Sequence, residues 1–286
     1  MKRIFVPTDF SACSDYAINY AIELAERYKS EIFVVHGFNP NTEIITSDLI
    51  TPFQGVPGTL SAQQINEFVE ERNQYIDKNL SEIEQLGHKK GITLNTSKVG
   101  SSVFEDLADQ AQDLNCDIVV MGSHGSSGME EAIVGSNTQK FVRYSKIPVL
   151  VIKQPPLKLN DIAFFSTFTE EGEKDSFNRF IKLFNNSQSK MHFVYVNTPS
   201  NFLDTPTADK RIQSFLKETK PLNYDCHIYN ELSVEEGVSG FSNRNDIDMV
   251  VLATHGYTGL RRLFHHSYSE SIINHLNVPV LTFSLR

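Results

Sequence analysis

Three glycines and a serine in the first half of the chain have the types and spacing of a phosphate-binding loop. They stand in the order Gly122-x-x-Gly125, then nine residues, then Gly135-Ser136. Gly122 follows an apolar run that predicts a strand, and ligands of open α/β sheets bind at the carboxyl ends of strands. Glycines there can take positive φ and let backbone amides approach an anion. A helix beginning at Ser136 would add free N–H groups and its dipole, so the pattern predicts phosphate binding.

The second half of the chain repeats the segment that carries this loop. Residues 117–128 align without a gap with residues 248–259, an offset of 131 residues. A period of this length indicates a duplicated domain. The second copy has lost two of the small residues: Gly122 is replaced by Ala253 and Gly135 by His266. This asymmetry predicts one working nucleotide site and one degenerate site.

Apolar runs that alternate with helical patterns predict an α/β fold in both halves. The strands expected in the first half are Ile4–Val6, Ile32–Val35, Ile92–Lys98, Asp117–Met121 and Ile147–Ile152. The helical patterns there are Ala17–Glu26, with Ser11 and Ser14 as candidate N-caps, Ser61–Leu86, Val103–Leu114 and Ser136–Tyr144. The second half repeats this order, starting with strands at Ile162–Phe165, His192–Val196 and Tyr224–Tyr229 and including a short helix around 200–220. Strands that are apolar almost throughout are typical of a parallel sheet with helices on both faces.

The boundary between the copies is expected at a segment with paired prolines. We predict domains at residues 1–153 and 160–286, with residues 154–159 as the linker. Aligning Asp9 with Thr167 gives an offset of 158 residues at the front of the repeat. The second copy is therefore 27 residues shorter (158 − 131), mostly in the region of the first copy's long loop and second helix.

Composition excludes several classes of protein. The 286 residues carry a net charge of −9 without a basic run, which argues against nucleic-acid binding. The three cysteines are odd in number and form no CxxC motif, so neither a disulfide framework nor a zinc site is expected. No apolar run approaches the ~18 residues of a membrane span, and the N-terminus has no signal-peptide core. We therefore expect a cytoplasmic protein that binds neither nucleic acid nor membrane.

The motifs resemble those of the universal stress protein family, in its ATP-binding branch. The segments that carry the resemblance are Val6–Ser11, Val34–His36, Gly122–Gly125 with Gly135-Ser136, and Ile147–Ile152. It covers nearly the whole chain as a tandem pair. The resemblance implies two tandem Rossmann-like domains, each a five-stranded parallel sheet in the order 3-2-1-4-5 with helices on both faces.

The resemblance also implies an adenine nucleotide in the first domain, with ATP as the cofactor and Mg²⁺ as a further candidate. The adenine would lie near the first two strands and the phosphates on the loop from Gly122 to Ser136. Asp9 would contact the ribose or the adenine. The ligand-binding residues implied are Pro7, Thr8, Asp9, His36, Gly37, Met121, Gly122, His124, Gly125, Gly135, Ser136 and Asn137.

Departures from the family pattern affect both sites. In the first half, Gly37 stands where the family usually has an apolar residue against the adenine, so one packing contact with the base is lost. In the second half Asp9 becomes Thr167, in addition to Ala253 and His266, so we expect no ATP there. A small anion could still bind in the cleft framed by Thr167, Asn197, Thr254, His255, Gly256 and Ser267, although a pocket filled by side chains is the simpler outcome.

Structural interpretations compete with several of these ligand interpretations. The glycines could form tight turns without a ligand, and Asp9 could cap the first helix. His124 and its counterpart His255 occur in both copies, which favours a structural hydrogen bond over catalysis. Nothing completes a tetrahedral metal site around the adjacent pair 265–266, so no metal site is expected. Without a Gly-x-Ser-x-Gly motif and triad, the nearby serines are interpreted as phosphate-binding hydroxyls: Ser123, Ser126, Ser127 and Ser136.

These observations favour a stress-response protein that senses or regulates through a nucleotide in its first domain. Occupancy would alter the order of the loop and hence partner binding. No general base is identifiable, so efficient hydrolysis is not expected. Two alternatives stay open, a slow ATPase or autophosphorylating protein that uses Ser123, Ser126 or Ser136 as acceptor, and a scaffold without a ligand.

The last strand of each copy predicts how the copies meet. Val149–Ile152 and Val280–Phe283 are apolar strands at sheet ends, and an uncovered edge invites pairing. Family members commonly dimerise through this strand, and a tandem chain can make the same pairing internally. We expect the two strands to pair antiparallel within one chain, giving a pseudo-twofold arrangement, with a homodimer as the other option.

Overall fold

Strands and helices alternate along the computed structural model, which describes residues 1–39, 62–100, 104–123, 136–153, 159–169, 171–184, 189–219, 221, 223–255, 272–273 and 276–285. The strands are β1 (Arg3–Thr8), β2 (Glu31–Gly37), β3 (Leu94–Val99), β4 (Ile118–Gly122), β5 (Val149–Ile152), β6 (Asp161–Phe165), β7 (Lys190–Asn197), β8 (Tyr224–Asn230), β9 (Met249–His255) and β10 (Val280–Leu285). The helices are α1 (Ala12–Tyr28), α3 (Ala62–Lys90), α4 (Phe104–Asp113), α5 (Ser136–Tyr144), α6 (Glu171–Phe184), α7 (Thr205–Thr219) and α8 (Val234–Arg244), with a 3₁₀ turn η1 at Pro199–Asn201.

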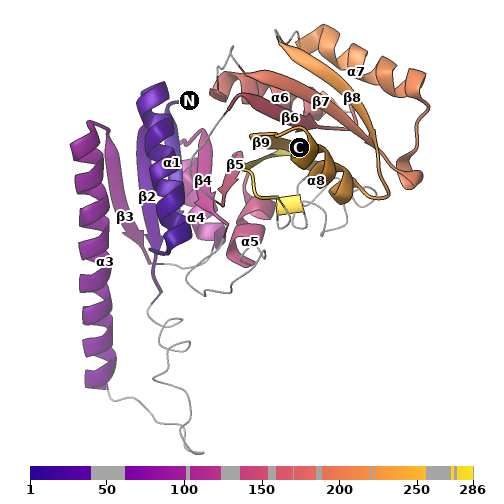
Figure 1. Cartoon of the computed structure of the whole chain (residues 1–286). Helices are drawn as coiled ribbons and strands as arrows, with labels where there is room; N and C mark the ends of the chain where they lie inside the picture. The colour runs from indigo at the N-terminus through magenta and orange to yellow at the C-terminus, as the bar shows by residue number, and fades with distance from the viewer. Residues whose placement is uncertain are drawn as a thin grey trace, which may run out of the picture.

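One ten-stranded sheet passes through both halves of the chain (Figure 1). Its order is β3-β2-β1-β4-β5-β10-β9-β6-β7-β8, which is 3-2-1-4-5 in each half. All neighbouring strands within a half are parallel. The predicted α/β class and strand order are confirmed.

The halves join where β5 pairs with β10. The two strands are antiparallel, with Leu281 opposite Leu150 and Val280 opposite Val151. The Thr282 hydroxyl adds a side-chain hydrogen bond to the Val149 carbonyl at 3.2 Å. The predicted pairing within the chain is confirmed, and β5 is therefore flanked by β4 and β10 rather than lying at an open edge.

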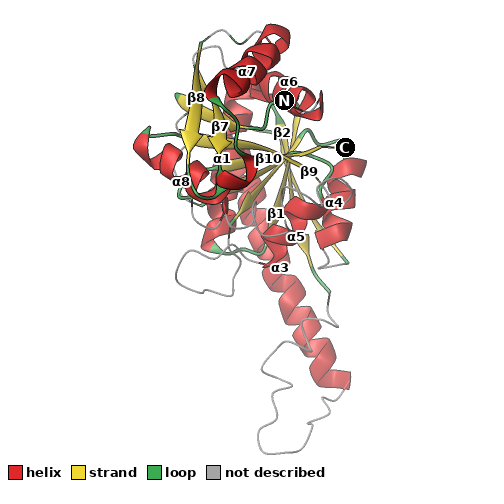
Figure 2. Ribbon diagram, turned by 90° about the vertical axis from the view of Figure 1, so that its right-hand side faces the viewer, coloured by secondary structure: helices red, strands yellow, loops and turns green. Residues whose placement is uncertain are grey.

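Helices cover both faces of the sheet (Figure 2). Each face has its own apolar core. Side chains of α1, α6 and α7 pack together on one face. Ile83 and Leu86, in the C-terminal part of α3, pack against them. Those of α4, α5 and α8 pack on the other face. The central strands are buried because both of their faces are covered, which explains their almost continuous apolar sequence. The outer strands β3 and β8 are exposed or half-buried over most of their length.

A repeated aspartate interaction supports both offsets of the duplication. The Asp117 carboxylate accepts hydrogen bonds from the backbone N–H groups of residues 2 and 3, at the start of β1. The Asp248 carboxylate does the same for residues 160 and 161, at the start of β6. The carboxylates differ by 131 positions and the strand starts by 158, as the alignment requires.

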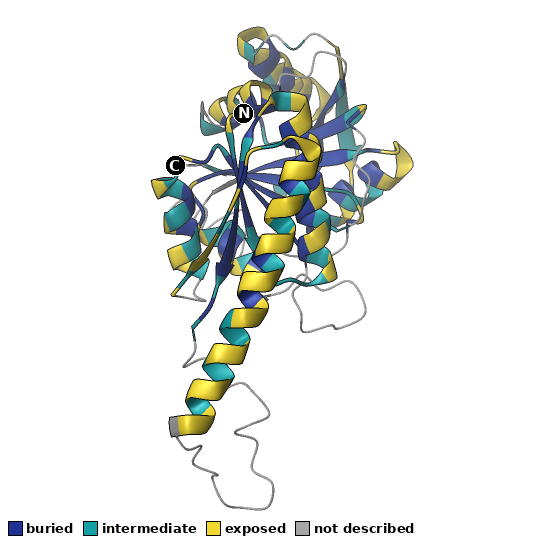
Figure 3. Ribbon diagram, turned by 90° about the vertical axis from the view of Figure 1, so that its left-hand side faces the viewer, coloured by how far each residue is buried: buried dark blue, intermediate teal, exposed yellow. Residues whose placement is uncertain are grey.

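The copies differ most in the helix after their second strand. In the first copy α3 has 29 residues, whereas α7 has 15. Figure 3 shows that α3 runs past the sheet and that this part is largely exposed or half-buried. Helix α7 is longer than the short helix predicted there. Asp204 caps its start by accepting a hydrogen bond from the Thr207 N–H. None of the helices in the described segments is long and apolar enough to span a bilayer.

Candidate functional site

The turn after β1 positions Asp9. Its carboxylate accepts a hydrogen bond from the Ser11 N–H at 3.1 Å. Ser11 itself caps α1, because its hydroxyl accepts from the Ser14 N–H at 3.3 Å. Ser14 lies inside the helix, so of the two candidate caps Ser11 is correct. Asp9 therefore fixes the turn ahead of the helix and is not itself the cap.

Phe10 occupies a strained backbone conformation at the same turn. Its φ is 62°, and its N–H donates to the Thr8 hydroxyl at 3.1 Å. The second copy repeats this geometry, because Phe168 has a φ of 56° and donates to the Ser166 hydroxyl at 3.0 Å. A positive φ is unfavourable for a bulky residue. Its presence in both copies indicates a structural role that does not depend on the intact nucleotide motif.

His36 connects the carboxyl ends of β1 and β2. His36 is 4% exposed, and its Nδ1 lies 2.8 Å from the Thr8 carbonyl oxygen. A carbonyl can only accept, so Nδ1 carries the proton. The ring stacks on Phe10 at a centroid distance of 4.5 Å. Gly37 ends β2, and the next residue, Phe38, supplies a buried apolar side chain that packs on α3.

Gly122 is required by close packing rather than by its backbone conformation. A Cβ at this position would lie 2.5 Å from the Cys13 carbonyl oxygen at the start of α1. Among the described glycines, Gly91 has a positive φ and Gly122 does not. Gly122 therefore does not use the positive φ that a glycine at this place can take. Because Gly122 has no side chain, the first turn of α1 packs closely against the end of β4.

The first turn of α5 is held at the carboxyl end of β4. Thr138 is 4% exposed, and its hydroxyl donates to the Gly122 carbonyl at 3.0 Å. Ser136 begins the helix and Asn137 is exposed beside it. The strand order reverses between β1 and β4. Ligands of open α/β sheets bind at this topological switch point.

Other predicted site residues divide into three groups. Pro7 and Thr8 end β1 opposite Val35 and His36 of β2 in the parallel register, and Gly37 is the last residue of β2. The Met121 side chain is 7% exposed and packs in the core on the α4 and α5 face. Three loop residues lie outside the described segments: His124, Gly125 and Gly135.

In the second copy a buried carboxylate occupies the turn that matches the Asp9 turn. Glu173 is 4% exposed and accepts hydrogen bonds from the Thr167 N–H at 3.0 Å, the Thr167 hydroxyl at 2.9 Å and the Thr169 N–H at 2.8 Å. Its counterpart at the 158-residue offset is Asp15, which is exposed in the first copy. Partial burial and the neighbouring Asp9 carboxylate raise the pKa of Asp15.

This arrangement argues against an anion in the second cleft. Two of the residues expected to frame the cleft already make hydrogen bonds within the protein. Thr167 donates to Glu173. The Asn197 amide bonds to the backbone of Leu203 and to the side chain of Asn230. The buried carboxylate that bonds to Thr167 would repel a phosphate. The remaining framing positions have side chains outside the described residues: Thr254, His255, Gly256 and Ser267, together with His266.

The family model of the universal stress proteins matches residues 1–153 and 169–284. The chain belongs to the universal stress protein family. Two universal stress proteins of Methanocaldococcus jannaschii are 26% and 29% identical to it over 154 and 162 residues, each covering 54% of this chain and 83% or 95% of the relative. Each alignment therefore spans about one copy of the repeat.

Solved universal stress proteins share the fold of the whole chain. The protein from Archaeoglobus fulgidus has a TM-score of 0.66 at 18% identity, covering 99% of this chain and 96% of the other. A second one, from Pseudomonas aeruginosa, has a TM-score of 0.68 at 14% identity, covering 99% and 93%. The fold shared with these proteins thus extends over both copies of the repeat in this universal stress protein.

Two residues that shape the sites of this universal stress protein were missed in the sequence. Thr138 stands two positions after Ser136, and a hydroxyl in the first turn of a helix is a signal that could have been noticed. Glu173 looked like an ordinary acidic residue near a helix start. Its burial depends on how the turn at Thr167 folds back, which no spacing rule predicts.

Proposed function

We propose that the first half of this universal stress protein binds an adenine nucleotide, ATP in the first instance, and acts as a nucleotide-dependent sensor. The observation that carries this is the hydrogen bond from Thr138 to Gly122, which holds the N-terminus of α5 at the carboxyl end of β4. Free N–H groups and the dipole of a helix favour phosphate at that position. The Gly135-Ser136 pair stands directly at this helix start.

The proposed roles follow the two ends of the nucleotide. Asp9 would contact the ribose or adenine, beside Pro7 and Thr8 at the end of β1. His36 and Gly37 would lie on the adenine side. The phosphates would contact the loop and the start of α5, through Met121 and Gly122 by their backbone and through His124, Gly125, Gly135, Ser136 and Asn137.

The second half supports a stoichiometry of one nucleotide per chain. Thr167 replaces Asp9, Ala253 replaces Gly122, and the Glu173 carboxylate is buried in the turn. A negative charge there opposes the binding of a polyphosphate. Occupancy of the first site alone would then order its loop and change which partner binds. The absence of a disulfide among Cys13, Cys116 and Cys226 is compatible with the cytoplasmic location that we propose.

The test combines identification of a co-purified nucleotide by mass spectrometry with calorimetric titration of the full chain with ATP, ADP and AMP. We expect one site per chain, and Gly135→His should weaken binding by at least about tenfold because the imidazole fills the phosphate position. His266→Gly is the matched control at the equivalent position of the second half and should leave affinity unchanged. Two equivalent sites, or unchanged binding by Gly135→His, would contradict the proposal.

Turnover separates the sensor from the enzymatic alternative. Phosphate release would be measured with and without Mg²⁺, followed by mass spectrometry for phosphoserine. The sensor proposal expects neither multiple turnovers nor a modified serine. Ser123 is fully buried, which disfavours it as an acceptor. A chain that binds no adenine nucleotide at millimolar concentration would favour the scaffold alternative instead.

A further inference from the structure

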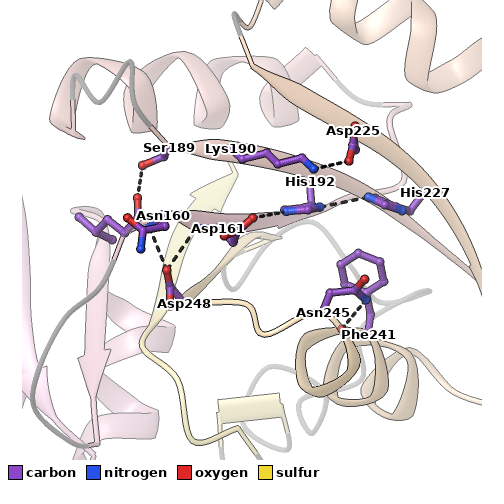
Figure 4. A network of polar contacts seen from close by, with 11 residues as sticks. Asn160, Asp161, Ser189, Lys190, His192, Asp225, His227, Phe241, Asn245 and Asp248 are labelled. Carbon is purple, nitrogen blue, oxygen red and sulfur yellow. Dashed lines mark hydrogen bonds and ion pairs between the residues drawn. The ribbon is translucent and has the colours of Figure 1, made fainter.

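Three potential metal ligands lie together on β7 and β8 of the second copy. His192 of β7 stands opposite Asp225 of β8 in the parallel register, and His227 follows two residues later. Side chains two residues apart on a strand point to the same face, so all three face α8. Figure 4 shows His192 and His227 in a row with Asp161, close to Asp225 and Lys190.

The separation of the two imidazoles suits a shared ion. His192 Nδ1 lies 3.1 Å from His227 Nε2, and one ligand atom from each of the three side chains falls within 4.8 Å of the others. Two nitrogens bound to a tetrahedral zinc at about 2.0–2.1 Å lie about 3.3–3.4 Å apart. Small side-chain movements would therefore admit an ion between the rings.

Asp161 orients His192 for such a role. The His192 Nε2 lies 2.9 Å from the Asp161 carboxylate, so the proton belongs on Nε2 and the lone pair of Nδ1 faces His227. A carboxylate behind a ligating histidine is the usual arrangement at metal sites. His192 is 6% exposed, and Phe241 of α8 packs edge-on against His227 at a centroid distance of 4.8 Å. Both rings are therefore held in place.

Lys190 opposes metal binding. Its ammonium lies 2.6 Å from the Asp225 carboxylate, and the two side chains are 40% and 49% exposed. An ion pair this exposed is weak, so a divalent ion could displace the ammonium from the carboxylate. Lys190 should therefore lower the affinity without blocking the site.

At the matching register positions the first copy carries no equivalent set of ligands. Its β1 starts at Arg3 opposite Glu31, as β6 starts at Asp161 opposite Lys190. The same register positions then hold Phe33, Asn95 and Ser97 in place of the two histidines and the aspartate. The cluster also lies toward the amino ends of its strands, away from the carboxyl ends that hold a nucleotide in this fold. It is therefore independent of the proposed nucleotide site.

We propose that His192 Nδ1, His227 Nε2 and the Asp225 carboxylate bind one divalent transition-metal ion of the zinc type. Imidazole ligands suit Zn²⁺, Co²⁺, Ni²⁺ and Cu²⁺. Three protein ligands leave a coordination position for water, on the side of the exposed Asp225. Asp161 acts as a positioning residue through the His192 ring.

The experiment titrates the full chain with Co²⁺, followed by its visible absorption, and then displaces Co²⁺ with Zn²⁺. We expect one equivalent with a tetrahedral or five-coordinate spectrum. His227→Asn should lose that equivalent, and Asp161→Asn should weaken binding by about 10–100-fold. His88→Asn, on the exposed face of α3, is the matched control and should bind as the parent chain does. Circular dichroism establishes that each variant is folded.

Lys190→Gln distinguishes a metal site from a purely structural histidine pair. Removing the competing ammonium should strengthen Co²⁺ binding, whereas the loss of a structural ion pair would not. Unchanged or weaker binding by Lys190→Gln would overturn the role of Asp225 as a ligand. A Co²⁺ spectrum that is the same in His227→Asn and the parent chain would overturn the site itself.

Discussion

At the scale of single residues, the end of β4 is governed by the missing side chain of Gly122. The first turn of α1 approaches so closely that a Cβ would meet the Cys13 carbonyl at 2.5 Å. The matching residue of the second copy, Ala253, already carries a Cβ and is buried. The packing of the first helix against the fourth strand therefore differs between the copies. One glycine can thus serve both the fold and the proposed ligand site.

Gly122→Ala should destabilise the protein even without a ligand. The methyl group must push the start of α1 away, at a cost of about 1–3 kcal/mol in the free energy of unfolding, typical of overpacking. Ala253→Gly is the matched variant and should cost about 1 kcal/mol or less. Urea unfolding of the nucleotide-free chain measures both. A stability of Gly122→Ala equal to that of the parent would show that the glycine serves the ligand alone.

At the scale of elements, the turn between the first strand and first helix of each copy is built around the same strained phenylalanine. Phe10 and Phe168 share their positive φ and their hydrogen bond to the hydroxyl two residues earlier. What differs is the acidic residue in the first helical turns, exposed at Asp15 and buried at Glu173. The same backbone turn thus encloses the Glu173 carboxylate in the second copy, whereas the Asp15 side chain of the first copy stays exposed.

Glu173→Ala should destabilise the second copy more than a surface change would. Three donors of Thr167 and Thr169 would lose a charged acceptor inside the protein, at a cost of about 2–4 kcal/mol. Asp15→Ala, at the equivalent position of the first copy, should change stability by about 0.5 kcal/mol or less. Thermal or urea unfolding compares the two. Equal effects would contradict a distinct role for Glu173.

The elements were easier to predict than the contacts between them. Buried strands such as β4 and β7 are visible as apolar runs, because both of their faces are covered. Bounds differed by a few residues, as for β3, which starts at Leu94 rather than Ile92. Glu173 and the His192–His227 pair could not be read from spacing. Their proximity depends on how a turn folds and on which residues of neighbouring strands come into register.

At the scale of the whole molecule, the antiparallel pairing of β5 and β10 merges two copies into one sheet. Leu150 and Leu281 are fully buried opposite each other at this junction. Their apolar neighbours on the same face belong to both copies, so the core is continuous across it. The last strand of each copy is thus paired inside the chain.

Cutting the chain between the copies should not separate them. We propose residues 154–159 as the linker, and a specific protease site inserted there would yield two pieces. These should elute together in gel filtration because the β5–β10 junction and its core persist. Leu281→Asp should cause the cut pieces to separate, since a buried charge opposes the pairing. Pieces of the unsubstituted chain that part after cleavage would contradict a stable junction.

The covalent joining of the two copies also removes a constraint that a symmetric dimer imposes. When two identical subunits pair, every substitution appears twice, once at each site. Here the copies share one chain, so Thr167, Glu173 and the histidine pair of the second half could arise without altering Asp9 or Gly122. Joining the copies in one chain thereby permits two different binding sites, the proposed nucleotide site in the first half and the proposed metal site in the second.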